Sequence, residues 1–286
     1  MEKTVFLNGQ YLKESEAKIS IFDRGFIFGD GVYEVVPVVE STVLDKEPFL
    51  ERFSRSLREI DLKLPFSQEE LLNMIEKLIE LNSVKEGGVY MQITRGVAPR
   101  DFAFPKDITP TCMAFSFEKN IINNPKAETG VKVATTKDLR WKRRDIKSIS
   151  LLAQCMAKED VSKKGAFEGW MVEDGMVSEG TSSSAYIVKD NTIITRPLTN
   201  SILPGIRRKI ILEIAEKYDI KVELRPFSVE EAYKADEAFL SSATTFVLPI
   251  VEIDGKKIGN GKPGNVTKKM RELYINSALE IAGVKR

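Results

Sequence analysis

The chain has 286 residues, 43 Lys and Arg against 42 Asp and Glu, two cysteines and no histidine. Without imidazole it has no Ser-His-Asp or Cys-His nucleophilic system and no HExxH zinc site, so a carboxylate, a lysine or a tyrosine must move any proton. The balanced charge provides no field for nucleic acid or membranes, two cysteines indicate a reducing interior, and no apolar run reaches the ~18 residues of a spanning helix. We therefore expect a globular, cytoplasmic protein without nucleic-acid, membrane or metal partners.

The first part of the chain is expected to alternate strands and helices. Asn8-Gly9 suits the positive φ angles of a hairpin turn between two short apolar runs. Ser67 followed by Glu70 predicts a capping box at the start of a helix. Apolar periodicity predicts strands over 5–7, 11–12, 31–39, 88–95 and 111–117, and helices over 49–62 and 67–82.

The second part begins after a segment rich in Asn and Pro, residues 119–128, which we interpret as a linker. Three dipeptides lie between β-like runs as hairpin turns should: Asp174-Gly175, Asp190-Asn191 and Asp254-Gly255. We expect a strand over 131–136 and helices over 149–164, 205–218, 228–235 and 265–282. The sequence thus predicts an α+β protein with an N-terminal domain over 1–118 and a C-terminal domain over 129–286.

One charged segment ends in a candidate nucleophile. Residues 138–147, DLRWKRRDIK, contain five basic residues in ten, which we interpret as a solvated face because the total charge is balanced and Trp141 is the one aromatic residue. Lys147 borders the apolar stretch that follows, so its amine is a candidate for desolvation and a lowered pKa. The alternative is an ordinary surface lysine.

Three further segments have backbones suited to a polar ligand: FGDGVYE (28–34) at a strand entry, VSEGTSSS (177–184) with Glu179 beside four hydroxyls, and LPGIRR (203–208) at a helix start that suits phosphate. Each alone is equally typical of a turn, an exposed loop or a helix start that binds nothing. Together with a reactive lysine and no histidine, they indicate an enzyme that takes its electron sink from pyridoxal phosphate. The lysine would form the Schiff base and move the Cα proton, and the carboxylate would keep the pyridine nitrogen protonated.

These segments resemble the fold type IV pyridoxal-phosphate aminotransferases nearly from end to end, most closely the D-amino-acid aminotransferases. The matching motifs are DRGFIFGDGVYEVV (23–36), LERFSRS (50–56), VYMQITRGVAPRDFAFP (89–105), DIKSISLLAQCMAKEDVSKKGAFEGW (145–170), VSEGTSSS, LPGIRR and FLSSATTFVLPIVEIDG (239–255). The resemblance implies a two-domain fold with a smaller N-terminal α/β domain and a larger C-terminal pseudo-barrel domain that binds the cofactor.

The resemblance also implies roles for particular residues. Lys147 would be the Schiff-base lysine and Glu179 would face the pyridine nitrogen. The phosphate would be bound by Arg52, by the backbone amides of Ile206 and Arg207, and by Thr244, while Ala243 stands where relatives often have a threonine. Ser182 and Ser183 would lie near cofactor and substrate.

Tyr33 and Arg100 would hold the substrate carboxylate, and Arg100 would come from the neighbouring subunit of a homodimer. Phe102 stands where relatives use a histidine, which removes one hydrogen bond that Lys106 or Arg95 would have to replace. The implied reaction is ping-pong transfer of an amino group from a D-amino acid such as D-alanine to a 2-oxo acid such as 2-oxoglutarate. The alternatives are an L-branched-chain aminotransferase, an aminodeoxychorismate lyase and a non-catalytic carrier of the cofactor.

Overall fold

The computed structural model describes residues 2–284 and divides into two compact units. Unit 1 contains the described residues up to Asn120, the segment Ile146–Ser150 and residues 281–284, and unit 2 contains Ile121–Asp145 and Leu151–Glu280. Lys147 therefore belongs with the N-terminal strands and not with the C-terminal segment to which we had assigned it. The domain limits at 118 and 129 otherwise stay a prediction.

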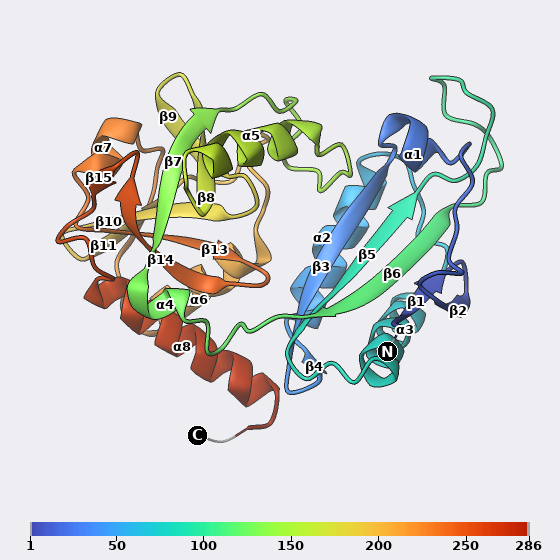
Figure 1. Ribbon diagram of the computed structural model, residues 1–286, viewed down its shortest axis with the longest axis horizontal. Coiled ribbons are helices and arrows are strands. Elements are labelled where there is room, and N and C mark those ends of the chain that lie inside the picture. Colours follow the sequence, from blue (N-terminus) through green and yellow to red (C-terminus); the bar gives the residue numbers. More distant parts are fainter. Residues whose placement is uncertain (1, 285–286) are drawn as a thin grey trace. The chain divides into compact units, whose positions relative to one another are not determined.

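Unit 1 is built on a six-stranded antiparallel sheet with the order β2-β1-β6-β5-β3-β4 (Figure 1). The Asn8-Gly9 turn joins the first two strands, as the dipeptide predicts. All the long strands that we predicted here are present. The strands are β1 (Thr4–Leu7), β2 (Gln10–Lys13), β3 (Gly31–Val39), β4 (Thr42–Val43), β5 (Gly87–Thr94) and β6 (Thr111–Glu118).

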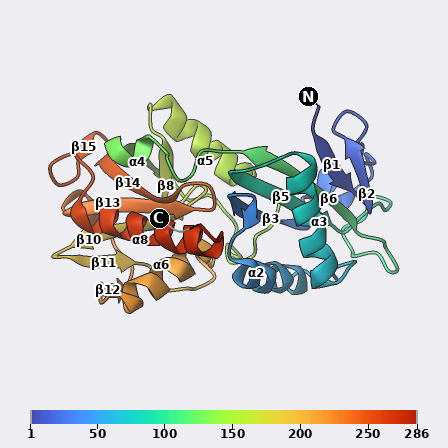
Figure 2. The same cartoon turned by 90° about the horizontal axis from the view of Figure 1, so that it is seen from below.

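Three helices belong to unit 1: α1 (Arg24–Phe28), α2 (Lys46–Arg58) and α3 (Gln68–Leu81). Helix α3 has the predicted capping box, and it packs with α2 against the sheet (Figure 2). Helix α2 begins three residues earlier than predicted because Pro48, which lacks an N–H, is tolerated in a first helical turn. Helix α1 was not predicted, since five residues show no periodicity.

Unit 2 is built on a nine-stranded mixed sheet, in which eight strands follow the order β12-β11-β10-β13-β14-β7-β8-β9 and β15 pairs with β14. Strand β9 lies at one end of this order, yet only three residues join it to β10. Such a short connection requires the sheet to curl, as the predicted pseudo-barrel does. The strands are β7 (Val131–Lys137), β8 (Glu168–Glu173), β9 (Met176–Gly180), β10 (Ser184–Lys189), β11 (Thr192–Thr195), β12 (Val222–Leu224), β13 (Glu237–Ser242), β14 (Phe246–Ile253) and β15 (Lys256–Lys257).

Helices surround the curled sheet of unit 2 (Figure 1). They are α4 (Lys126–Thr129), α5 (Leu152–Lys163), α6 (Ile206–Lys217), α7 (Val229–Tyr233) and α8 (Asn265–Ile281). Trp170, Phe227 and Leu240 are among the buried side chains between strands and helices. Glu237, at the start of β13, accepts hydrogen bonds from the backbone N–H groups of Val266 and Thr267 and so caps α8. Within residues 2–284 no helix has both the length and the apolar content that crossing a membrane requires.

Candidate active site

Lys147 is held in unit 1 by its backbone. Its carbonyl accepts the N–H of Tyr33 at 3.0 Å, and its own N–H donates to the Ser56 hydroxyl at 3.3 Å. Residues 147–149 thereby extend along the edge of β3, opposite β5. The side-chain amine lies 4.2 Å from the centre of the Tyr33 ring and, in the part of the chain that the structure describes, forms no ion pair. Because no carboxylate of the described residues pairs with it, the amine is sterically available to a ligand.

Arg52 lies one helical turn before Ser56 on α2 and is paired with Glu34 of β3. The Arg52 guanidinium donates Nε to Glu34 Oε1 at 2.7 Å and Nη2 to Oε2 at 2.6 Å. The Glu34 side chain is 1% exposed and that of Arg52 is 11% exposed. A bidentate pair with so little solvent around it fixes the direction of the guanidinium. Lys147, Tyr33 and Arg52 thus all lie around the start of β3.

Glu179 is the buried carboxylate of unit 2, at the end of β9. Its Oε1 accepts hydrogen bonds from Arg140 Nη1 and from the Leu203 N–H, the latter at 3.1 Å. Arg140 in turn forms a bidentate pair with Asp138, which also accepts the Ser178 hydroxyl at 2.6 Å. The run 138–147 is therefore only in part the solvated face that the sequence predicts. Leu139, Trp141 and Lys142 are exposed, whereas Asp138 and Arg140 pair with each other in the interior of unit 2.

The ion pairs oppose the effect of burial on both carboxylates. Burial raises the pKa of Glu179, while the Arg140 guanidinium and the Leu203 N–H act to lower it. Burial acts in the same direction on Asp138, but the hydrogen bonds from Arg140 and Ser178 outweigh it and hold the pKa of Asp138 below its ordinary value. Arg140 therefore pairs with two carboxylates at once: Asp138, whose pKa is lowered, and Glu179, whose pKa burial raises.

Three of the four hydroxyls after Glu179 donate hydrogen bonds to another buried carboxylate, Glu168, although Ser182 itself is exposed. Glu168 of β8 accepts hydrogen bonds from the hydroxyls of Thr181, of Ser182 at 2.8 Å and of Ser183 at 3.3 Å. The Gly180 N–H bonds back to the Ser183 carbonyl at 2.7 Å. The segment between β9 and β10 is consequently a tight turn with its side chains directed to Glu168.

The start of α6 presents the geometry expected for an anion. Gly205 is the N-cap and provides no side-chain hydrogen bond, so the first amides of the helix, those of Ile206 and Arg207, are not capped by a side chain. A Cβ at Gly205 would lie 2.8 Å from the Ser184 hydroxyl, and Ser184 pairs with Ser241 of β13. Thr244 follows in the turn between β13 and β14 and is half-buried. The phosphate-binding candidates of unit 2 thus share one end of the sheet.

These residues fit pyridoxal phosphate. Among the described residues, Glu179 Oε2 accepts a single hydrogen bond, from the Leu203 N–H at 3.3 Å, so it retains lone pairs for the N–H of a pyridinium ring. Leu203 lies two residues before Gly205, which connects this carboxylate to the start of α6. The side chain that would otherwise fill the space beside the first amides is absent at Gly205.

Arg100 lies at the end of unit 1 that carries α1, in the loop after β5. Its guanidinium is 5.5 Å from the ring centre of Phe28 and 5.4 Å from that of Phe102. Arg95, which we considered as a replacement for the missing histidine, is engaged elsewhere. It donates to Asp30 at 2.8 Å and to the carbonyls of residues 60 and 61.

Sequence reasoning assigned no role to Glu34, Arg140 or Glu168. Each had a recognisable signal. Glu34 interrupts the apolar positions 32 and 36 on one face of β3, Glu168 precedes the apolar residues 170–172 of β8, and Arg140 follows Asp138 by two residues. A charge at a buried position of a strand needs a partner, but the partner cannot be identified before the elements are placed. In the described residues, no group of three or more Cys, Asp and Glu side chains is arranged to hold a metal ion.

The sequence matches the family model for class IV amino-transferases over residues 31–253. The D-alanine aminotransferase of Staphylococcus haemolyticus is 42% identical over 279 residues, which are 96% of this chain and 98% of that protein. The D-alanine aminotransferase of Bacillus licheniformis is 39% identical over 277 residues, covering 96% of this chain and 97% of that one.

Solved structures of the same fold cover nearly the whole chain. A branched-chain amino acid aminotransferase from T.th., solved with pyridoxamine 5'-phosphate, has a TM-score of 0.92 at 22% identity and covers 100% of this chain and 96% of its own. The branched-chain aminotransferase of Thermoproteus uzoniensis with norvaline has a TM-score of 0.87 at 26% identity, covering 98% and 96%. The predicted two-domain fold is thereby confirmed.

Proposed function

Because the chain belongs to the class IV aminotransferase family, whose members are pyridoxal-phosphate enzymes, we propose that it transfers the amino group of a D-amino acid such as D-alanine to a 2-oxo acid such as 2-oxoglutarate. The relatives at 39% and 42% identity are D-alanine aminotransferases and span nearly the full chain. The branched-chain enzymes are similar at 22% and 26% identity, and so support an L-amino acid substrate less.

The observation that carries the proposal is the state of Lys147. Its amine contacts the Tyr33 ring and has no carboxylate partner among the described residues. A surface lysine that only interacts with water need not lie in a fixed place. A lysine that attacks an aldehyde and then accepts a proton must instead have an amine that no carboxylate occupies. The backbone pairing with β3 and the hydrogen bond to Ser56 keep the residue in this place.

We assign cofactor-binding roles to residues of each unit. When bound, pyridoxal phosphate supplies an aldehyde for amine exchange and a ring that takes up the electron pair left by the departing Cα proton. Lys147 would attach to the aldehyde carbon, and Glu179 would accept the pyridine N–H. The phosphate would be bound by Arg52, the Ile206 and Arg207 amides and Thr244, with Ser182 nearby.

Two ion pairs prepare these groups. Arg140 stabilises the ionised form of Glu179 against the effect of burial, so the carboxylate can accept a hydrogen bond from a protonated ring nitrogen. Glu34 directs the Arg52 guanidinium and limits its motion, which reduces the entropy lost when a phosphate binds. With its amine free, Lys147 would act as the base that takes the proton from the substrate Cα and later gives it back as an acid.

Substrate recognition would rest on Tyr33, Arg100 and Ser183. Tyr33 is adjacent to Lys147, so a carboxylate bound by its hydroxyl would lie near the reacting amine. Arg100 would reach the site of a second copy of the chain, which makes the homodimer the proposed active form. Cys112 and Cys155 are both unpaired, which agrees with the proposed location in the cytoplasm.

The test incubates the purified protein with D-alanine and 2-oxoglutarate and measures the pyruvate that is formed. A parallel reaction contains L-leucine in place of D-alanine. Lys147→Ala should abolish turnover, and the control Lys163→Ala, whose side chain is 73% exposed, should not change it. Turnover of L-leucine alone would assign the chain to the branched-chain enzymes. Binding of the cofactor without turnover of either substrate would make the chain a carrier, and pyruvate release from aminodeoxychorismate would make it a lyase.

A further inference from the structure

The rings of Phe28 and Phe102 both lie beside the guanidinium of Arg100, on the same side of it. The two rings lie 5.6 Å apart with an angle of 45° between their planes, and the guanidinium carbon is at nearly equal distances from both. Both distances fall within the ~6 Å over which a cation is attracted to the face of an aromatic ring. Phe102 is 77% exposed, so it contributes little to the packing of unit 1 itself.

Three arginines meet at this end of unit 1, and their donors are used differently. Arg24 donates to Asp30 at 2.7 Å and to the carbonyls of Asp101 and Phe102. Arg95 donates Nε to the same carboxylate and its two remaining nitrogens to backbone carbonyls. Arg100, by contrast, forms no ion pair and donates no hydrogen bond to the residues that the structure describes. The N–H donors of Arg100 remain available for a ligand, while the rings of Phe28 and Phe102 contact its guanidinium.

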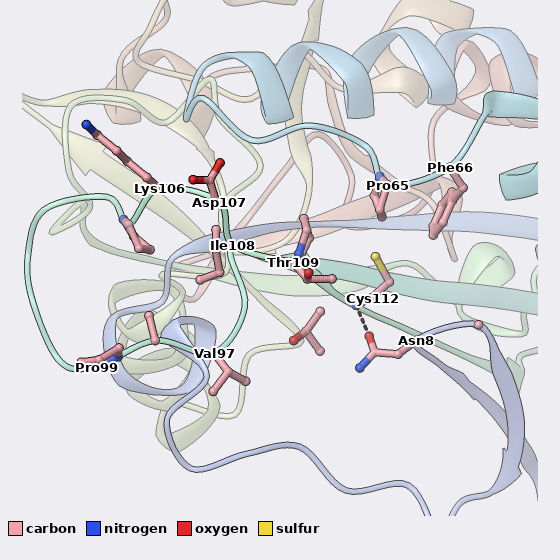
Figure 3. Close-up of a pocket in the computed structure, with 15 residues that line it drawn as sticks. Asn8, Pro65, Phe66, Val97, Pro99, Lys106, Asp107, Ile108, Thr109 and Cys112 are labelled. Atoms are coloured by element: carbon pink, nitrogen blue, oxygen red, sulfur yellow. Dashed lines mark hydrogen bonds between the residues drawn. The ribbon is translucent and has the colours of Figure 1, made fainter.

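The loop that carries Arg100 is not packed from beneath. Its two ends, residues 97–99 and 105–110, line a cavity of about 710 Å³ together with Pro65 and Phe66 (Figure 3). Figure 3 shows Val97 and Pro99 of the loop at this cavity, with Ile108 across from them. Because atoms that border a cavity lack packing partners there, the position of the loop depends on its other contacts. Those contacts include the Arg24 hydrogen bonds, the backbone bridge between Asp23 and Val97, and the contacts of Phe28 and Phe102 with Arg100.

We propose that Phe102, together with Phe28, is a positioning residue that orients Arg100 for the substrate carboxylate through contact of the rings with the guanidinium. This inference rests on the proposed function and deepens it. The residue that replaces a histidine does not bind the carboxylate itself. It limits the directions that the Arg100 guanidinium can take, so that less ordering is needed when substrate binds.

The first test is steady-state kinetics of Phe102→Leu with D-alanine. An exposed cation–ring contact corresponds to a change of about two- to fivefold in binding, so KM should rise by that factor while kcat is retained. Phe102→Tyr, which keeps the ring, should restore the wild-type KM. Phe26→Leu is the matched control, because Phe26 is 71% exposed in the same unit and forms no ring contact with Arg100. In an Arg100→Ala background, Phe102→Leu should have no further effect.

The second test does not depend on activity. The arginine Nε–H resonance of Arg100, assigned by its loss in Arg100→Lys, should be displaced by the ring currents in the wild type. It should move toward the position of unperturbed arginines in Phe102→Leu and stay in place in Phe26→Leu.

An equal rise of KM in the wild-type and Arg100→Ala backgrounds would overturn the positioning role, as would an Arg100 resonance that Phe102→Leu leaves unmoved. Should the wild-type protein turn over no amino acid, the proposed function fails. The resonance then still decides whether the rings hold Arg100.

Discussion

Glu168→Gln is the substitution that tests most directly how the turn after Glu179 is held. The two oxygens of Glu168 share four donors. Oε1 accepts the Gly169 N–H at 2.8 Å and the Thr181 hydroxyl, and Oε2 accepts the hydroxyls of Ser182 and Ser183. Glutamine keeps the shape but presents an NH₂ group in place of one oxygen. The hydroxyls can rotate to accept from that NH₂, so the substitution removes the charge of the acceptor rather than the contacts.

A hydrogen bond to a charged group contributes about 1.5–3 kcal/mol and a neutral one about 0.5–1.5 kcal/mol, so weakening the three hydroxyl hydrogen bonds lowers the free energy of unfolding by about 3 kcal/mol. For a unit of this size, that loss lowers the melting temperature by roughly 6–12 °C. Differential scanning calorimetry of the two proteins at equal cofactor saturation measures the difference.

Glu159→Gln is the matched control, since Glu159 is 65% exposed and its pair with Lys163 lies on the surface of α5. This control should change the melting temperature by less than about 2 °C, because exposed pairs contribute little. A Glu168→Gln protein that melts as close to the wild type as the control does would refute the reasoning. The Glu168 carboxylate would then not be what holds the turn.

Three further substitutions test other parts of the site. Asp138 has a pKa below its ordinary value of 3.8, so its stabilisation is fully present above that value and is lost as the pH falls through the lower pKa of the folded state. Asp138→Asn should therefore unfold more easily than the wild type near pH 7, and the difference should shrink below about pH 4 in a pH series of thermal melts. Glu34→Gln removes the carboxylate that pairs with Arg52 and should cost about 3–5 kcal/mol in urea unfolding, with a higher Kd for pyridoxal phosphate. Gly96 has a φ of 106° and its Cβ position overlaps a facing backbone carbonyl, so Gly96→Ala should cost about 1–3 kcal/mol and raise the KM for D-alanine.

Each of these three has a result that contradicts it. For Asp138→Asn, the contradicting result is a stability difference from the wild type that stays constant from neutral to acidic pH. It would show that the partners of Asp138 do not lower its pKa. Glu76→Gln removes an exposed carboxylate paired with Lys46, and should leave both unfolding and cofactor binding unchanged. Glu34→Gln would lose its proposed role if it behaved like that control. A Gly96→Ala protein with unchanged stability would mean that the backbone there relaxes without cost.

Local features of the fold could be predicted from the sequence because neighbours in the chain determine them. The capping box of Ser67 and Glu70 requires only residues three positions apart, and helix α3 has it. The Asn8-Gly9 turn likewise depends on two residues with positive φ angles. Helix α1 could not be predicted in this way. Its five residues are stabilised by the Asp23 side chain and by contacts of Arg24 with a loop more than seventy positions away.

The charged run 138–147 was in part misinterpreted, for a physical reason. A run of basic residues is typical of a solvated face when each charge is hydrated and has no ion-pair partner. In this chain Asp138 and Arg140 satisfy each other, and Arg140 reaches Glu179, 39 positions further on. Composition and periodicity cannot predict this contact, because it depends on how β9 is placed beside the segment after β7.

The sequence by itself determined which chemistry is possible. With no histidine in the chain, proton transfer falls to a carboxylate, a lysine or a tyrosine, and the motifs around Lys147, Glu179 and Gly205 indicate a pyridoxal-phosphate enzyme. The tertiary structure decided how the charges of that site are paired. Glu34 directs Arg52, Arg95 donates to backbone carbonyls, and within residues 2–284 Arg100 donates no hydrogen bond. These pairings join residues far apart in the chain, and strand register and helix packing, not local spacing, bring their side chains within hydrogen-bond distance.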